Sequence, residues 1–121
     1  MRLEKLPWDF SICRLASLPE ADSAREFFFV AKTDREISLV CRTQDVPPET
    51  SGRSDGWKGF RAAGTLDFSL VGILSELTGI LAENAIGLFA VSTFDTDYIL
   101  VREADFEKAV SALTAAGHTF G

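Results

Sequence analysis

Short hydrophobic runs alternate with polar links along the first half of the chain, and the spacing within each run predicts its local structure. Residues 10–15 (FSICRL) place side chains alternately on two faces, which predicts a short strand. Residues 27–32 and 37–42 are β-rich runs joined by the polar link 33–36, a spacing that predicts a β-hairpin. The polar segment 18–26 contains an early proline and has room for one or two helical turns.

The middle of the chain changes from turn-forming residues to a helical period. Residues 43–56 are dense in proline, glycine, serine and acidic residues and predict a loop, whereas residues 57–66 predict an extended segment. Apolar residues recur every three or four positions over 71–85, which predicts an amphipathic helix. Ser69 stands at the N-cap position, and Gly79 predicts a kink or a close backbone contact within the helix.

The last third of the chain predicts two strands, a helix and a final strand. Residues 86–92 and 98–102 are apolar runs joined by the polar link 93–97, which predicts a second hairpin. Residues 103–116 carry an apolar face behind an acidic first turn, a pattern typical of a helix. Residues 118–120 complete the series with one short strand.

The order of these elements predicts an α+β fold. From residue 57 onward the order is βαββαβ, the ferredoxin-like arrangement, in which an antiparallel sheet carries both helices on one face. Residues 6–56 supply a strand, a short link and two further strands, which resembles the same unit with its helices reduced to links. We therefore expect two units, 1–56 and 57–121. Units of about 60 residues bury little surface alone, so they should share a sheet or pack as one body.

The charge and composition of the chain indicate its cellular location and exclude some classes of partner. The 121 residues carry 12 basic and 18 acidic side chains, a net charge of −6, without a basic cluster that would attract nucleic acid. No apolar run approaches the roughly 20 residues of a membrane span, and the first residues are too polar for a signal peptide. Cys13 and Cys41 lie in apolar runs without CxxC spacing, which predicts buried, reduced thiols in a cytoplasmic protein.

The sequence lacks the residue patterns of common enzymes. His118 is the only histidine, which excludes a multi-histidine metal centre, and nothing positions a third group beside a cysteine and this histidine. Asp95 and Asp97 are too few for a calcium loop, and the glycines match no phosphate-binding or dinucleotide motif. We expect no catalysis, no cofactor and no metal.

Two segments are candidates for binding a small ligand. Residues 69–72 lie at a strand-to-helix turn, where free backbone N–H groups favour an anion, and Gly72 lets a ligand approach closely. Residues 92–97 offer hydroxyls and two carboxylates to an ammonium or guanidinium group. The alternatives are structural: Ser69 as a helix cap, Thr93 as a turn residue, and Asp97 bonding within its own turn.

The second half of the chain resembles the ACT domain. The resemblance rests on Asp67–Leu74 (DFSLVGIL) and Ile86–Val101 (IGLFAVSTFDTDYILV), and it covers roughly residues 60–121. The sequence is similar to the tandem ACT domains of aspartate kinases and of the cytosolic arginine sensor CASTOR. The first half matches only as a degenerate ACT-like unit. The resemblance implies a βαββαβ fold without catalysis and a small ligand, usually an amino acid, bound at an ACT–ACT interface.

The resemblance also implies particular ligand contacts and a regulatory role. In arginine-binding relatives the turn after the STF motif contacts the ligand, and a neighbouring turn borders its α-carboxylate. The matching residues are Thr93, Phe94 and Asp97 in the first turn, and Ser69, Val71 and Gly72 in the second. We therefore expect an allosteric sensor of an amino acid, cationic if the acidic turn binds its side chain. A homodimer or a protein partner would complete the interface.

A ligand-free module for oligomerisation or protein interaction is the main alternative. Open sheet edges and an uncovered sheet face would drive such association. The state of the 92–97 turn distinguishes the two hypotheses. A mobile turn that orders with ligand favours the sensor, whereas a turn closed by its own hydrogen bonds favours the interaction module.

Overall fold

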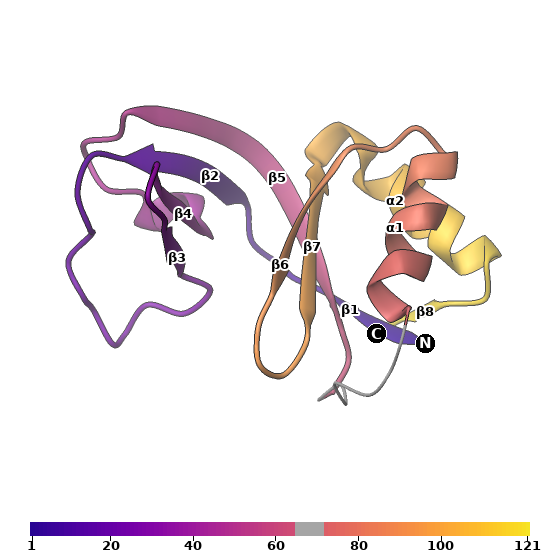
Figure 1. Cartoon of the computed structure of the whole chain (residues 1–121). Helices are drawn as coiled ribbons and strands as arrows, with labels where there is room; N and C mark the ends of the chain where they lie inside the picture. The colour runs from indigo at the N-terminus through magenta and orange to yellow at the C-terminus, as the bar shows by residue number, and fades with distance from the viewer. Residues whose placement is uncertain (65–71) are drawn as a thin grey trace. The chain divides into compact units, whose positions relative to one another are not determined.

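The computed structural model describes residues 1–64 and 72–121, and the chain divides into two units. The helical unit comprises Met1–Pro7 and Lys58–Gly121, and the strand unit comprises Trp8–Trp57. Strand β5 (Gly52–Ala62) is shared, because its first half belongs to the strand unit and its second half to the helical unit (Figure 1).

The helical unit has the predicted βαββαβ order, with one added strand. After β5 its elements are α1 (Ile73–Glu83), β6 (Leu88–Ser92), β7 (Asp97–Arg102), the 3-10 turn η2 (Glu103–Asp105), α2 (Phe106–Ala115) and β8 (Thr119–Phe120). Strand β1 (Arg2–Lys5) pairs antiparallel with β5 and parallel with β8. The strands therefore follow the order β6-β7-β5-β1-β8. The sheet that we expected to be antiparallel contains this one parallel pair, because β1 lies between β5 and β8.

The strand unit has the same strand order without helices. Its elements are β2 (Phe10–Leu15), β3 (Phe29–Lys32), β4 (Ile37–Arg42), the 3-10 turn η1 (Thr43–Asp45) and the first half of β5. They form the order β3-β4-β2-β5 with every pair antiparallel. This is the ferredoxin-like strand order. The structure describes every residue of Trp8–Trp57, and within this range loops replace both helices. The predicted hairpin of residues 27–42 is confirmed as β3 and β4.

Residues 18–26 do not form the one or two helical turns for which the sequence has room. The segment contains only a turn, in which Asp22 Oδ1 accepts a hydrogen bond from the Ala24 N–H at 2.9 Å and the Asp22 carbonyl accepts one from the Arg25 N–H at 3.1 Å. A short aspartate side chain competes with the helical backbone for N–H donors, which favours a turn over a helix.

The predicted loop of residues 43–56 is shorter than expected. Strand β5 already begins at Gly52, and its first residues pair with β2, as in the registers Cys13↔Arg53 and Ile12↔Ser54. A bulge follows, and Gly56 adopts φ = 82° within it. Turn-forming composition predicted a loop here, but pairing with an adjacent strand overrides such local preferences.

The core of the helical unit lies between the sheet and both helices. Alternate residues of the strands belong to this core, and α1 and α2 each contribute two buried residues to the same cluster. The fully or almost fully buried members are Leu3, Phe60, Ala62, Leu77, Leu81, Ile99, Val101, Ala109 and Leu113. Both helices therefore cover one face of the sheet, as the sequence predicts.

The start of α1 differs from the prediction. The first helical residue is Ile73, and Gly72 occupies the N-cap position with φ = 84° and no side-chain cap. Ser69, which we expected at the cap, lies outside the described residues. Of the two alternatives expected at Gly79, the close contact is not found among the described residues, because a Cβ placed there would meet none of their atoms within 4 Å.

Both helices end in the same hydrogen-bonded motif. In α1, Ile86 N–H donates to the Leu81 carbonyl and Ala85 N–H donates to the Ala82 carbonyl, each at 3.0 Å. In α2, His118 and Gly117 donate equivalent bonds to carbonyls of the last helical turn, also at 3.0 Å. These are Schellman motifs, which require a left-handed residue directly after the cap. Glycine fills that position after α2, and alanine fills it after α1 with φ = 56°.

We expect Ala85→Gly to stabilise the protein by up to about 1 kcal/mol, because glycine adopts the left-handed conformation without the clash that a Cβ causes. Gly117→Ala, the reverse change at the equivalent position, should destabilise it by about 1 kcal/mol. Urea denaturation followed by circular dichroism measures both changes. Changes of the same sign in the two variants would show that the backbone conformation is not the cause.

The two cysteines form part of the core of the strand unit. Both thiols are free and buried, and they cluster with Leu15 and Leu39 on one face of the β2–β4 pair. Burial raises the pKa of both thiols, and that of Cys41 reaches about 12. The prediction of buried thiols is confirmed, and the raised pKa values leave little thiolate at neutral pH.

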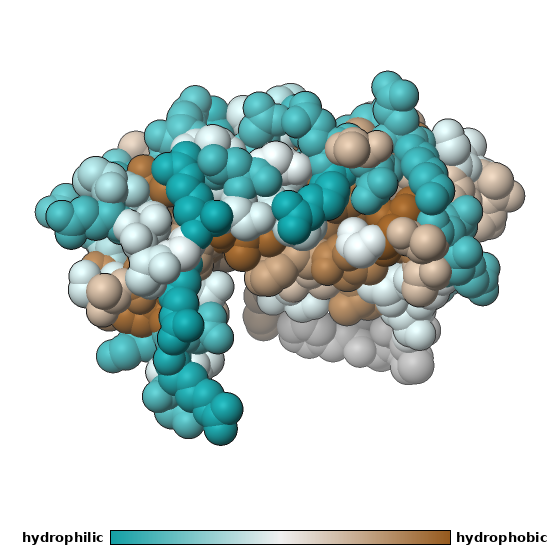
Figure 2. All heavy atoms as spheres, turned by 90° about the horizontal axis from the view of Figure 1, so that it is seen from above, coloured by the Kyte–Doolittle hydropathy of each residue, from teal (hydrophilic) through white to brown (hydrophobic). Residues whose placement is uncertain are grey.

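Hydrophilic residues cover most of the face of the molecule that Figure 2 shows, with hydrophobic residues visible between them. Within the described part of the chain, no helix has the length and the apolar composition to cross a membrane.

Candidate functional site

The structure describes four of the six predicted ligand contacts. Gly72, Thr93, Phe94 and Asp97 lie in the helical unit, whereas Ser69 and Val71 lie outside the described residues. Gly72 is exposed at the start of α1, and the other three belong to the β6–β7 turn or to the start of β7. The two segments are therefore assessed as two separate features.

Gly72 leaves the first turn of α1 open. Its carbonyl accepts the Glu76 N–H at 2.8 Å, the first helical hydrogen bond, and no side chain caps the helix. A Cβ at this position would meet no atom within 4 Å, so the space around it is unfilled by the described residues. The positive end of the helix dipole lies at this turn and favours an anionic group.

The β6–β7 turn is closed by its own hydrogen bonds. The N–H and Oγ1 of Thr93 donate to the Thr96 carbonyl at 2.9 Å and 3.1 Å. Thr96 is itself buried, and its hydroxyl donates to the Ala62 carbonyl on β5 at 3.2 Å. The turn is therefore fixed to the sheet at Thr96, and the hydroxyls of both threonines are already engaged.

Asp97 bonds a side chain of the neighbouring strand. Its Oδ1 accepts the Ser92 hydroxyl at 2.6 Å across the end of the hairpin. This contact differs from the bond to its own backbone that the structural alternative proposed. One hydroxyl uses only part of the acceptor capacity of a carboxylate, so Asp97 can accept further N–H donors. Neither Asp95 nor Asp97 pairs with a cation among the described residues.

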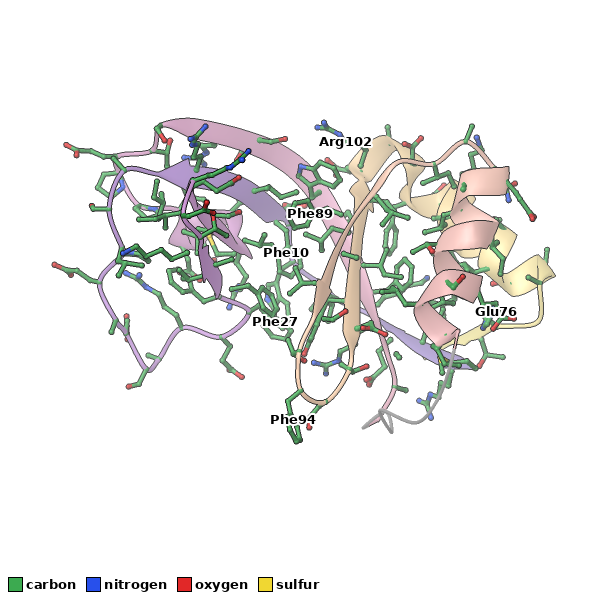
Figure 3. The ribbon with its side chains drawn as sticks, viewed as in Figure 1. Phe10, Phe27, Glu76, Phe89, Phe94 and Arg102 are labelled. Atoms are coloured by element: carbon green, nitrogen blue, oxygen red, sulfur yellow. The ribbon has the colours of Figure 1, made fainter. Side chains whose placement is uncertain are left out.

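Phe94 lies at the tip of the hairpin and is 80% exposed. Figure 3 shows it pointing away from the sheet and from α1, where Glu76 marks the first helical turn.

Arg61, which the sequence did not indicate as a functional residue, links three strands beside the acidic turn. Arg61 on β5 donates from Nη1 to the Tyr98 hydroxyl at 3.4 Å and from Nε to Glu4 Oε1 at 3.3 Å. The hydroxyl of Tyr98 and the carboxylate of Glu4 raise the pKa of Arg61 above its usual range. The side chain thus connects β1, β5 and β7 beside the start of the acidic turn. Its partners lie far away along the chain, so no local pattern could reveal it.

The comparisons with known proteins agree with this geometry. The sequence model of the ACT domain matches residues 53–115. A solved structure from Agobacterium tumefaciens is 33% identical, with a TM-score of 0.86 over 99% of this chain and 91% of its own. A search of curated proteins gives no match. The chain belongs to the ACT-domain family.

More distant structures share the fold. A Vibrio cholerae protein described as a possible transport protein is 20% identical, with a TM-score of 0.67 over 94% of this chain and 88% of its own. The aspartate kinase of Clostridium acetobutylicum, described as an allosteric enzyme, is 15% identical with a TM-score of 0.65. This match covers 94% of our chain but 33% of the kinase, so our chain corresponds to one part of that enzyme.

Proposed function

We propose that this chain is a non-catalytic, cytoplasmic regulatory protein that binds an amino acid or a similar small metabolite at an interface between ACT surfaces. Membership of the ACT-domain family supports the proposal, and so does the similarity of fold to part of an allosteric aspartate kinase. The ligand contacts would be Thr93, Phe94 and Asp97 on one surface and Ser69, Val71 and Gly72 on the other.

The observation that carries this proposal is that Asp95 and Asp97 form no ion pair among the described residues. Asp95 and Asp97 lie within three residues of each other, and hydrogen bonds from Ser92 and Thr93 hold the hairpin end in place. A carboxylate that is not already paired with a cation can accept charge-assisted hydrogen bonds from an ammonium or guanidinium group. A cationic amino acid such as arginine or lysine is therefore the ligand that fits this turn best.

The mechanism would be a ligand-dependent change in association. The turn binds the cationic side chain, and the open start of α1 in a second copy binds the α-carboxylate. A ligand that contacts both surfaces has a higher affinity for the associated state, so it shifts the equilibrium toward the homodimer. A protein partner that recognises one state would then respond to the ligand.

A thermal-shift screen against all proteinogenic amino acids tests the proposal. A ligand at 100 times its dissociation constant adds about 2.7 kcal/mol, which raises the midpoint by several degrees in a chain of this size. We expect one selective shift, strongest for a cationic amino acid. No shift from any amino acid would contradict the sensor function.

Asp97→Asn should weaken binding of the cationic amino acid by about ten-fold or more, because a charge-assisted hydrogen bond contributes about 1.5–3 kcal/mol. Glu107→Gln is the control, because it removes one negative charge from an exposed side chain of α2, away from the acidic turn. Isothermal titration measures both affinities, and unchanged binding to the Asp97 variant would remove this residue from the site.

A ligand-free association module is the second candidate, and two observations favour it. The turn is already closed by its own hydrogen bonds, and Phe94 exposes most of its ring at the tip. An exposed aromatic side chain on a fixed turn can anchor a contact between proteins.

Phe94→Ser should convert an associated form to monomer if this aromatic contact holds it together. Leu18→Ser is the control, because Leu18 is also a large exposed hydrophobic residue, 57% exposed in the strand unit. Sedimentation velocity gives the oligomeric state of each variant. A wild-type protein that remains monomeric across micromolar concentrations would exclude the homodimer in both hypotheses.

A further inference from the structure

The strand unit contains a hollow of about 450 Å³ at the end of β2 and beside the β3–β4 turn. Its volume lies in the range of small-molecule sites, which are usually about 300–1,000 Å³. The lining residues are Arg14, Leu15, Ala16, Thr33, Arg35, Glu36, Ile37 and Ser51. Two arginines and one glutamate give the lining a net charge of +1, in a chain whose net charge is −6.

Both arginines are available to a ligand. Arg14 donates one bond from Nη2 to the Arg35 carbonyl at 3.4 Å, which places its guanidinium beside the turn. Neither guanidinium pairs with a carboxylate of the described residues. Two guanidinium groups that lack a carboxylate partner line one hollow, and together they offer several N–H donors to a bound oxyanion.

Hydrogen bonds keep the β3–β4 turn in a fixed conformation. Thr33 Oγ1 accepts the N–H groups of Arg35 and Glu36 at 3.1 Å and 3.2 Å, and Thr33 N–H donates to the Glu36 carbonyl at 2.9 Å. The β6–β7 turn has the same closing bond, from Thr93 N–H to the Thr96 carbonyl at 2.9 Å. The two turns share this hydrogen bond, but the β3–β4 turn carries Arg35 between Asp34 and Glu36, whereas the β6–β7 turn has no basic residue.

Backbone contacts also fix the opposite wall of the hollow. Ser51 donates from its N–H and from its hydroxyl to the Arg14 carbonyl, at 2.8 Å and 3.1 Å. This pair of bonds holds Arg14 against the segment that leads into β5. Leu15 and Ile37 provide apolar surface in the same lining. A ligand with a carbon skeleton would gain from these contacts, whereas a bare ion would not.

We propose that this hollow is a second binding site, specific for a small organic molecule that carries a carboxylate or phosphate group. The guanidinium groups of Arg14 and Arg35 bind the oxyanion, and the apolar wall contacts the rest of the molecule. Glu36 at the lining disfavours ligands with a high negative charge through like-charge repulsion. The site lies wholly in the strand unit, so it does not depend on the amino-acid site proposed for the helical unit.

NMR titration of the ¹⁵N-labelled full chain at low salt tests the proposal, with succinate, glycerol phosphate and inorganic phosphate as probes. We expect the organic anions to move the amide resonances of residues 14–16, 33–37 and 51. The carboxylate and phosphate probes show which oxyanion is preferred. Arg14→Gln and Arg35→Gln should each weaken binding by about ten-fold, as the loss of a charge-assisted bond requires.

Lys32→Gln is the matched control, because it removes the same charge from the same hairpin outside the lining. Its affinity for the probes should stay within two-fold of the wild type, roughly the effect of a distant screened charge. Binding that survives both arginine substitutions, or no movement of these resonances with any probe, would overturn the proposal. Resonances of residues 92–97 report on the other proposed site, so failure of one site is distinguishable from failure of the other.

Discussion

Phe60→Ala is expected to lower the free energy of unfolding by about 3–5 kcal/mol, the usual loss when a fully buried aromatic side chain is removed. Phe60 is 0% exposed and lies in the cluster that joins the sheet to both helices. Its ring packs edge-on against Phe120 on β8, with the centroids 5.6 Å apart. The alanine variant would leave a cavity beneath α1 and α2 that the surrounding backbone cannot fill.

Urea denaturation monitored by circular dichroism measures this loss. Phe94→Ala is the matched control, because it deletes the same atoms from a side chain that is 80% exposed. The control should change the free energy of unfolding by no more than about 0.5 kcal/mol. Equal losses in the two variants would mean that Phe60 does not occupy the core of the helical unit.

A larger side chain at the neighbouring residue, Gly59, is expected to destabilise the protein. Gly59 is buried on β5, and a Cβ built there would lie 2.6 Å from Leu100 Cδ2, 3.3 Å from Leu6 Cδ1 and 3.4 Å from the Ile99 carbonyl oxygen. The distance to Leu100 Cδ2 is too short for any Cβ, so Leu100 would have to move, and Leu6 would have to shift slightly, whereas the distance to the Ile99 carbonyl is an ordinary contact. We therefore expect Gly59→Val to destabilise the protein by about 1–3 kcal/mol through overpacking.

A double-mutant cycle with Leu100→Ala tests this explanation. If the clash with Leu100 causes the loss, the double variant should be more stable than the sum of the two single changes indicates, by about 0.5 kcal/mol or more. Strictly additive effects would show that Gly59 is required for another reason. Both measurements use the same denaturation experiment as Phe60→Ala.

These two variants also serve the functional experiments. Phe60 and Gly59 belong to the strand that carries Arg61, and Arg61 bonds Tyr98 next to the acidic turn. A loss of ligand binding in a core variant would therefore follow from a loss of structure. Asp97→Asn changes a partly exposed side chain at the hairpin end, so its effect on binding can be measured in a folded protein.

The amino-acid sequence determined most of the local structure, because periodicity and turn chemistry act over short distances. The apolar stripe of residues 71–85 predicted α1, and the β-rich runs around residues 33–36 and 93–97 predicted the two hairpins. The order of elements after residue 57 predicted the ferredoxin-like sheet with its helices on one face. The apolar runs around Cys13 and Cys41 predicted the buried thiols.

The sequence also located one candidate site through residue types and family motifs. The STFDTD segment indicated an acidic turn, and the structure places that turn at the end of a fixed hairpin. The internal hydrogen bonds of the turn were not predictable in detail, because Ser92, Thr93 and Asp97 could each bond several local partners. Its relation to Gly72 could not be read from the sequence at all.

Only the tertiary structure decided the features that depend on partners distant in the chain. Strand β1 lies between β5 and β8, so the first residues join the helical unit, and β5 begins at Gly52 because β2 offers it a partner. Arg14 and Arg35 line the same hollow only because the end of β2 lies beside the β3–β4 turn in the folded chain. Local patterns specify elements through short-range energetics, whereas strand neighbours and side-chain clusters depend on contacts between residues that are far apart in the sequence.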